Sequence, residues 1–97
     1  MKSVFIVFNQ ANTERVEYLL DMLSIKGFTF FEDVQGRGTN GGEPRRGTHT
    51  WPEMNSAVLT LMEDSKVPAL LDTIKKLDNR NTDVGVRAFV WNIEQTI

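Results

Sequence analysis

The chain has 97 residues, which is enough for one domain, residues 1–97, and too few for two. Hydrophobic residues make up 40% of it and charged residues 25%, and these ordinary values argue against a disordered chain. The net charge of −2 argues against nucleic-acid binding, and the absence of cysteine excludes disulfides, thiol catalysis and thiolate metal sites. No apolar run approaches the roughly 20 residues of a membrane helix, and the apolar start at residues 4–8 is too short for a signal peptide. We therefore expect a cytoplasmic protein that does not insert into membranes.

The first half of the chain predicts a strand, a helix and a second strand. Residues 3–8 are apolar on both alternating faces, as in a central strand that is buried on both sides. We expect Asn12 or Thr13 to cap the helix, and Gly27 to end it in the left-handed conformation of a C-cap. The second strand follows at residues 28–34. The buried stripe of the helix repeats every 3.6 residues and consists of Val16, Leu19, Leu20 and Leu23.

The second half of the chain repeats this order. Residues 55–62 predict a third strand, and residues 86–93 predict the last strand. Between them we expect a second amphipathic helix that is capped by Asp64 or Ser65. The repeat is typical of the α+β ferredoxin-like fold, βαββαβ. Right-handed crossovers then place both helices on one face of a four-stranded antiparallel sheet.

Two helices cover only one face of this sheet, yet the strands are apolar on both faces. On the first strand, Phe5 and Val7 lie opposite Val4, Ile6 and Phe8. On the last strand, Phe89, Trp91 and Ile93 lie opposite Ala88 and Val90. An exposed patch of this size is unusual for a monomer, so we expect a homo-oligomer that packs the open faces together. The alternative is a tilt of the strands that hides these side chains within one subunit.

Residues 36–54 form a long loop with a distinctive composition. It contains five of the seven glycines, three of the arginines and the only histidine, and it shows no periodicity. Glycine lets the backbone approach an anion, and arginine presents a planar fork that suits phosphate or carboxylate. The loop therefore predicts an anion-binding or protein-docking role, and the alternative is a flexible surface loop with solvated arginines.

His49 is the one candidate metal ligand in this loop. Glu43 and Glu53 are the nearest carboxylates in the sequence, and a metal site needs several ligands. His49 could meet a second copy of itself across a subunit interface. We expect Trp51 to anchor the loop in an apolar crevice rather than to stack on a ligand.

Three segments resemble the PII family, the trimeric nitrogen-regulatory signal transducers. Residues 33–38, Asp-Val-Gln-Gly-Arg-Gly, resemble the strand end and Gly-x-Gly that open the family's T-loop. Residues 46–47, Arg-Gly, resemble the Arg-Gly within that loop, and residues 84–90, Val-Gly-Val-Arg-Ala-Phe-Val, resemble the B-loop and the strand after it. The related CutA-type proteins share the trimer and the fold, but no feature of this chain favours them.

The resemblance implies a homotrimer that binds ATP, ADP or another small anion between subunits. It implies that the mobile T-loop docks on a target such as a transporter, an enzyme or a regulator. The ligand-binding residues would be Gly36, Arg37, Gly38, Thr39, Gly85 and Arg87. The docking loop would present Arg45, Arg46, Gly47, His49 and Trp51.

The chain also departs from the family pattern. Gly85 stands where the family has two glycines around an acidic residue, and Thr39 replaces a glutamine that senses nucleotide and 2-oxoglutarate. No arginine follows Arg87, whereas the family has C-terminal arginines for the phosphates, and the loop contains no tyrosine for uridylylation. These departures resemble a PII-like branch whose members bind other small ligands or accompany transporters, including metal-efflux pumps.

The sequence thus leads to a regulator that is not an enzyme. No nucleophile or acid–base pair is recognisable in it. One alternative is a metal-sensing trimer that is linked to metal tolerance or efflux and uses His49. A further alternative is a small enzyme on the same scaffold, since a fold does not fix a function.

Overall fold

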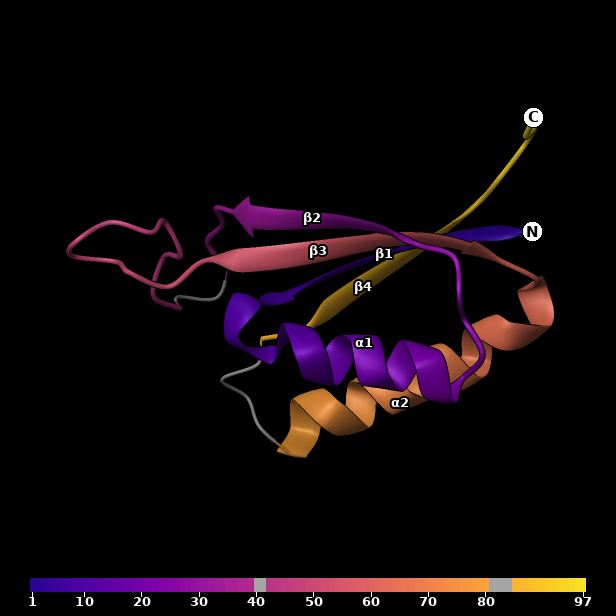
Figure 1. Ribbon diagram of the computed structural model, residues 1–97, viewed down its shortest axis with the longest axis horizontal. Coiled ribbons are helices and arrows are strands. Elements are labelled where there is room, and N and C mark those ends of the chain that lie inside the picture. The colour runs from indigo at the N-terminus through magenta and orange to yellow at the C-terminus, as the bar shows by residue number, and fades with distance from the viewer. Residues whose placement is uncertain (40–41, 81–84) are drawn as a thin grey trace.

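The computed structural model describes residues 1–39, 42–80 and 85–97, and it has the predicted α+β ferredoxin-like fold (Figure 1). The described strands are β1 (Lys2–Asn9), β2 (Thr29–Val34), β3 (Asn55–Met62) and β4 (Arg87–Asn92). The helices are α1 (Thr13–Met22) and α2 (Val67–Arg80), and each follows a short 3-10 turn, η1 (Gln10–Asn12) and η2 (Asp64–Lys66). The predicted strands and helices are therefore all present in the predicted order.

The four strands form one antiparallel sheet in the order β2-β3-β1-β4. The apolar strand β1 lies inside the sheet, where Phe5 pairs with Leu59 of β3 and with Phe89 of β4. The register breaks between Phe31 and Val34 at the end of β2. The sheet thus carries the long loop 35–54 at the end where β2 leaves it and β3 enters it.

The hydrophobic core lies between the sheet and the two helices. Both helices lie on the same side of the sheet (Figure 1), as the sequence predicts. Val4, Ile6 and Phe8 of β1 point into this layer and are fully buried. They pack in one cluster with the apolar stripes of both helices. Burial of these side chains provides the main favourable free energy of folding.

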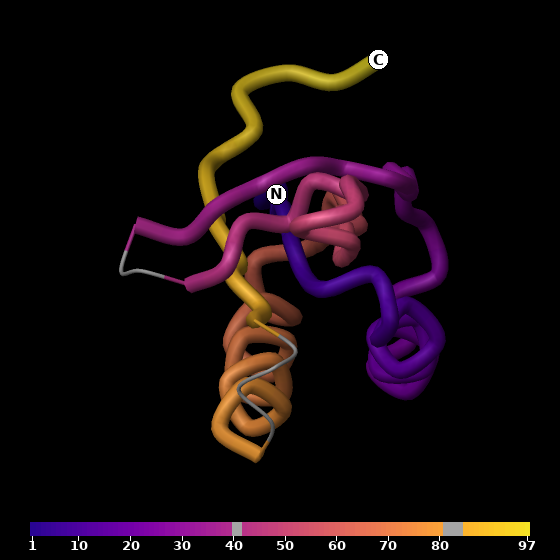
Figure 2. Tube along the Cα trace, turned by 90° about the vertical axis from the view of Figure 1, so that its left-hand side faces the viewer, coloured from indigo at the N-terminus to yellow at the C-terminus, as the bar shows by residue number. Residues whose placement is uncertain are grey.

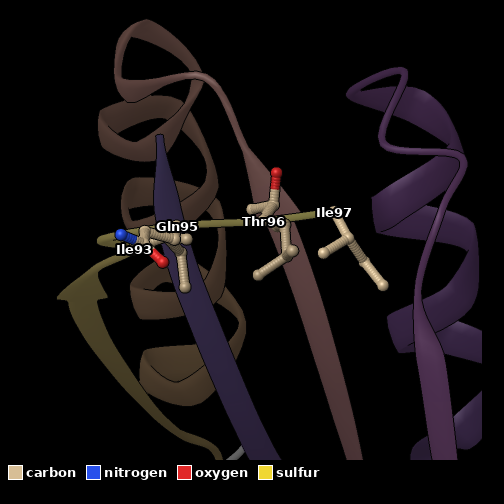
Figure 3. A pocket seen from close by; sticks show the side chains of 5 residues that line it. Ile93, Gln95, Thr96 and Ile97 are labelled. Atoms are coloured by element: carbon tan, nitrogen blue, oxygen red, sulfur yellow. The ribbon is translucent and has the colours of Figure 1, made fainter.

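The other face of the sheet is apolar and partly exposed. Phe89 and Trp91 of β4 keep 55% and 48% of their surfaces exposed, and Phe31 and Leu61 continue the patch on β2 and β3. The C-terminal residues 93–97 leave the sheet on the side away from both helices (Figure 2). Together with Leu61, this segment lines an open pocket of about 560 Å³, shown in Figure 3. No strand tilt hides the patch within one described subunit, so the second of our two expectations for this face is wrong.

The helix ends differ from the prediction. Helix α1 ends before Gly27, because Ser24 takes the left-handed conformation with φ 59°. The N–H groups of Ser24 and Ile25 donate to the carbonyls of Asp21 and Leu20, which is a Schellman motif. Buried Ile25 completes this motif, and its burial explains why the helix ends here rather than at the glycine.

The capping contacts also differ from the prediction. Asn12 occupies the N-cap position of α1, as one of the two predictions has it, but its side chain makes no capping hydrogen bond. The 3-10 turn η1 precedes the helix, and Asn9 caps that turn by accepting the N–H of Ala11. Likewise, η2 begins at Asp64 without a side-chain cap. Short 3-10 turns before a helix add few residues and carry no hydrophobic period that the sequence could reveal.

Candidate functional site

A pair of backbone hydrogen bonds closes the base of the long loop. The N–H of Gly36 donates to the carbonyl of Arg45 over 2.9 Å, and the N–H of Arg45 donates to the carbonyl of Gly36 over 2.7 Å. A Cβ at Gly36 would lie 2.8 Å from the side-chain amide nitrogen of Asn55, so any larger residue would force that side chain to shift. The loop is therefore pinned next to the sheet, although its sequence shows no regular pattern.

The part of the loop after Arg45 forms an outer turn. The N–H of Gly47 donates to the carbonyl of Glu53, and the N–H of Thr48 donates to the carbonyl of Trp51. The Thr48 hydroxyl accepts the N–H of Trp51, which is half-buried. This outer turn, residues 47–53, projects beyond the end of the sheet (Figure 1) and contains the exposed His49. Trp51 thus lies in the projecting turn and not at the loop base.

The Arg45 side chain joins the loop base to the turn before β4. Its guanidinium group donates from Nη1 to Oδ1 of Asn55 over 2.9 Å, and its Nε lies 3.9 Å from the Glu53 carboxylate. A Cβ at Gly85 would lie 2.6 Å from Nη2 and 2.9 Å from Nη1 of Arg45. Gly85 has φ +57°, so both its conformation and its contact with the guanidinium group favour glycine.

The Arg87 side chain is held by a carboxylate of α2. Its Nη1 donates to Oδ2 of Asp78 over 3.4 Å and to the carbonyl of Val86 over 2.7 Å. Oδ1 of Asp78 accepts the N–H of Val86 over 3.2 Å. The Asp78 carboxylate thus accepts from a backbone N–H and from a guanidinium group. These are the same kinds of donor that proteins use to bind an oxyanion.

The structure brings some of the predicted ligand-binding residues together and leaves others apart. Gly36 pairs with the backbone of Arg45, Gly85 lies against the Arg45 side chain, and Arg87 follows Gly85 by two residues. Residues 37–39 lie beyond the Gly36–Arg45 bridge and are exposed. The segment that resembles the B-loop begins at residue 84, which lies outside the described residues, as do residues 40–41 of the T-loop-like segment.

Of the predicted docking residues, Arg45 is the one whose placement does not fit that role. Only 19% of its side chain is exposed, because it packs at the loop base against Gly85. Its neighbour Arg46 is exposed, as are Gly47 and His49. The sequence could not separate the two arginines, since adjacent residues of an irregular loop carry no pattern of burial.

Three further side chains of this site were not assigned these contacts from the sequence. Asn55 and Glu53 hold Arg45, and Asp78 holds Arg87. Asn55 is buried and is the first residue of the apolar strand β3. A buried polar side chain needs a hydrogen-bond partner, so this polar residue next to an apolar run is the one local sign of its contact with Arg45. Asp78 lies near the end of α2, and only the fold places it beside β4.

The predicted metal site at His49 gains no support within one subunit. In residues 1–39, 42–80 and 85–97, no three histidine, aspartate or glutamate side chains lie close enough together to hold a metal ion. A site that His49 shares between subunits stays a prediction. Within the described part of the chain, no helix is long and apolar enough to cross a membrane.

Comparison with known proteins identifies the family. The nitrogen regulatory protein P-II family model matches residues 1–97. No curated protein matches the chain with significance. Among solved structures, the chain is similar to CPII, a nitrogen regulatory PII-like protein from Thiomonas intermedia K12, bound to ADP, AMP and bicarbonate. The two share 21% identity over 95% of this chain and 84% of that chain, with a TM-score of 0.78.

Two further structures have the same fold. The apo form of CPII shares 18% identity over 95% of this chain and 87% of that chain, with a TM-score of 0.73. A PII-like signaling protein from Thermus thermophilus shares 21% identity over 95% of this chain and 84% of that chain, with a TM-score of 0.69. The family match covers the whole length and agrees with the observed sheet order and loop position. The chain therefore belongs to the nitrogen regulatory protein P-II family.

Proposed function

We propose that this protein is a homotrimeric PII-like regulator that binds a small anionic effector and controls a target protein through the loop 36–54. The observation that carries the proposal is the packing of the Arg45 guanidinium group against the left-handed Gly85. Arg87 lies two residues further along the chain. Guanidinium groups and a left-handed glycine suit the oxygens of a phosphate or carboxylate.

Adenine nucleotides are the effectors that this site favours. CPII was solved with ADP, AMP and bicarbonate bound, and it has the same fold as this chain. The resemblance to PII proteins puts the corresponding segments in the cleft between neighbouring subunits. We expect ADP or AMP to bind there with its phosphates near Gly36, Gly85 and Arg87. A second small anion such as bicarbonate could bind to the same kinds of hydrogen-bond donor.

The apolar open face of the sheet supports an oligomer. The patch around Phe89 and Trp91 is large for the surface of a monomer, and packing it against two further copies would bury it. The exposed outer turn 47–53 is then free to dock on a target. The effector shifts the equilibrium between two loop conformations by as much as its affinities for them differ. Regulation of this kind needs no chemical step.

Equilibrium binding of ADP and AMP to the Arg87→Ala variant tests the effector site. We expect the dissociation constant to rise more than tenfold, because the variant loses a charge-assisted contact to the phosphate. The matched control is Arg15→Ala on α1, which removes the same exposed charge from another element and leaves binding unchanged. An unchanged dissociation constant in the Arg87 variant would remove Arg87 from the site.

A further inference from the structure

We propose that Gln10 and Asp33 form a latch that sets the direction in which the loop 36–54 leaves the sheet, and that opening this latch frees the loop to change conformation. The inference rests on the proposed function for the use of that change, which is control of a target by the loop. The family resemblance places Asp33 at a strand end but gives neither residue a role.

Gln10 follows β1 directly and contacts both ends of the loop. Its backbone N–H donates to the carbonyl of Met54, the last residue before β3, over 3.0 Å. Its side-chain nitrogen, Nε2, donates to Oδ1 of Asp33 near the end of β2 over 3.0 Å. The carbonyl of Gln10 accepts the hydroxyl of Thr13 at the start of α1, which holds the residue in place. One residue thus ties the point where the chain leaves β2 to the point where it enters β3.

Asp33 lies in a β-bulge. Phe31 and Val34 of β2 pair with residues 57 and 55 of β3, so β2 takes three steps where β3 takes two. Asp33 has φ 58°, a left-handed conformation that costs free energy for any residue with a Cβ. Bulges bend a strand and are frequent beside functional sites. The bend in β2 therefore depends on a strained aspartate whose side chain is bound by Gln10.

Loss of the bulge would rearrange the loop base as a whole. Side chains alternate along a strand, so a register shift of one residue moves those that follow to the opposite face of the sheet. Gly36, which exchanges two backbone hydrogen bonds with Arg45, would then meet the loop in a different orientation.

A second feature of the sheet lies opposite the bulge. Ser56 stands between the two paired residues of β3, and its buried hydroxyl has no hydrogen-bond partner in the described part of the chain. An unpaired buried hydroxyl and a strained Asp33 both raise the free energy of the latched arrangement. The end of β2 is therefore a place where two arrangements can have similar free energies.

The latch can open without loss of the fold. The contact joins side chains that are exposed to solvent, so water can replace either partner. The N–H of Gln10 keeps its bond to Met54 when Asp33 is released, and β1 keeps its pairing with β3 as far as Asn55. Opening thus changes the exit from β2 and leaves the entry into β3 in place.

The test is hydrogen exchange of the paired Gly36 and Arg45 amides, measured on the purified oligomer without nucleotide. Gln10→Glu puts a second carboxylate beside Asp33 and turns the hydrogen bond into repulsion. We expect both amides to exchange about tenfold faster, because the bond to a charged acceptor is lost. The matched control is Gln95→Glu, which adds the same charge at an exposed position after β4 and should match the wild type.

The double variant Gln10→Glu, Asp33→Asn reverses donor and acceptor across the latch. The asparagine amide can donate to the glutamate and tolerates the left-handed conformation, so we expect exchange within about twofold of the wild type. Gln10→Ala is the second variant in case Gln10→Glu fails to assemble, and we expect exchange about threefold faster, since the contact is lost without repulsion.

Wild-type exchange in either single variant of Gln10 would overturn the inference, and so would a double variant that exchanges as fast as Gln10→Glu. Equal acceleration in Gln95→Glu would also overturn it, because net charge would then be the cause. These outcomes leave the proposed effector intact, since no nucleotide is present. A wild-type protein that binds neither ADP nor AMP would overturn the effector and leave the latch in place.

Discussion

Gly85 shows how far the sequence predicts this site. The resemblance to PII proteins assigned Gly36, Gly85 and Arg87 to one candidate group, and the structure places the first two in contact with Arg45. The sequence could not identify Arg45 as their link, because it lies 40 residues before Gly85 and in a loop without periodicity. Contacts of that kind depend on tertiary packing, and neither composition nor spacing encodes them.

Asp78 is the residue whose charge most directly opposes an anionic effector. Asp78→Asn keeps an oxygen for the N–H of Val86 but removes the negative charge beside Arg87. We expect the affinity for ADP or AMP to rise severalfold, since the effector no longer competes with a carboxylate for the guanidinium group. The measurement is equilibrium binding at fixed ionic strength, because salt screens such charges.

Asp72→Asn is the matched control for this charge change. Asp72 lies on the same helix and pairs with Lys76, away from Arg87. It removes one negative charge from α2 and should leave nucleotide affinity unchanged. Equal gains in both variants would assign the effect to net charge, and a lower affinity in Asp78→Asn would show that Asp78 supports the site rather than opposing it.

The strands and helices were predictable, whereas their ends were not. Apolar runs on both faces located β1 and β3, and a 3.6-residue period located α1 and α2. The predicted end of α1 at Gly27 was wrong. Glycine is the usual residue in the left-handed conformation that ends a helix, but here Ser24 takes that conformation. Burial of Ile25 decides the position of the turn, and burial is a property of the whole fold.

Ser24→Gly should therefore stabilise the protein by roughly 0.5 kcal/mol. Relief of the left-handed strain contributes about 1–2 kcal/mol, and the greater freedom of glycine in the unfolded chain offsets about 0.4–1 kcal/mol of it. The measurement is the free energy of unfolding in urea, at one protein concentration because an oligomer's stability depends on it. Gly27→Ala is the control, since Gly27 has open space around its Cβ position and should change stability by less than about 0.5 kcal/mol. A loss of stability in Ser24→Gly would contradict this account of the helix end.

At the scale of the whole molecule, the sheet has one face covered by helices and one apolar face left open. The sequence predicted this asymmetry, because two helices cannot cover both sides of strands that are apolar throughout. What it could not predict is the course of residues 93–97, which leave the sheet over the open side (Figure 2). Their path depends on the sheet itself and on the hydrogen bond from the Ile93 N–H to the Met1 carbonyl.

Phe89→Glu tests whether the open face is the oligomer interface. A carboxylate at this position would be buried without a partner in the assembled form, so we expect the trimer to dissociate. Tyr18→Glu on α1 is the control, because Tyr18 is also an exposed aromatic residue, with 63% of its surface accessible, but lies on the helix side. Light scattering gives the mass of each variant, and circular dichroism verifies its fold. A trimeric Phe89→Glu variant would place the interface elsewhere.

Native mass spectrometry of the wild-type protein, with and without ADP and AMP, tests the central claim most directly. It reports the number of subunits and of bound ligands in one spectrum. We predict a trimer that takes up as many as three nucleotides, one for each cleft between subunits. A monomer, or a trimer that takes up neither nucleotide, would contradict the account of a nucleotide-responsive PII-family regulator.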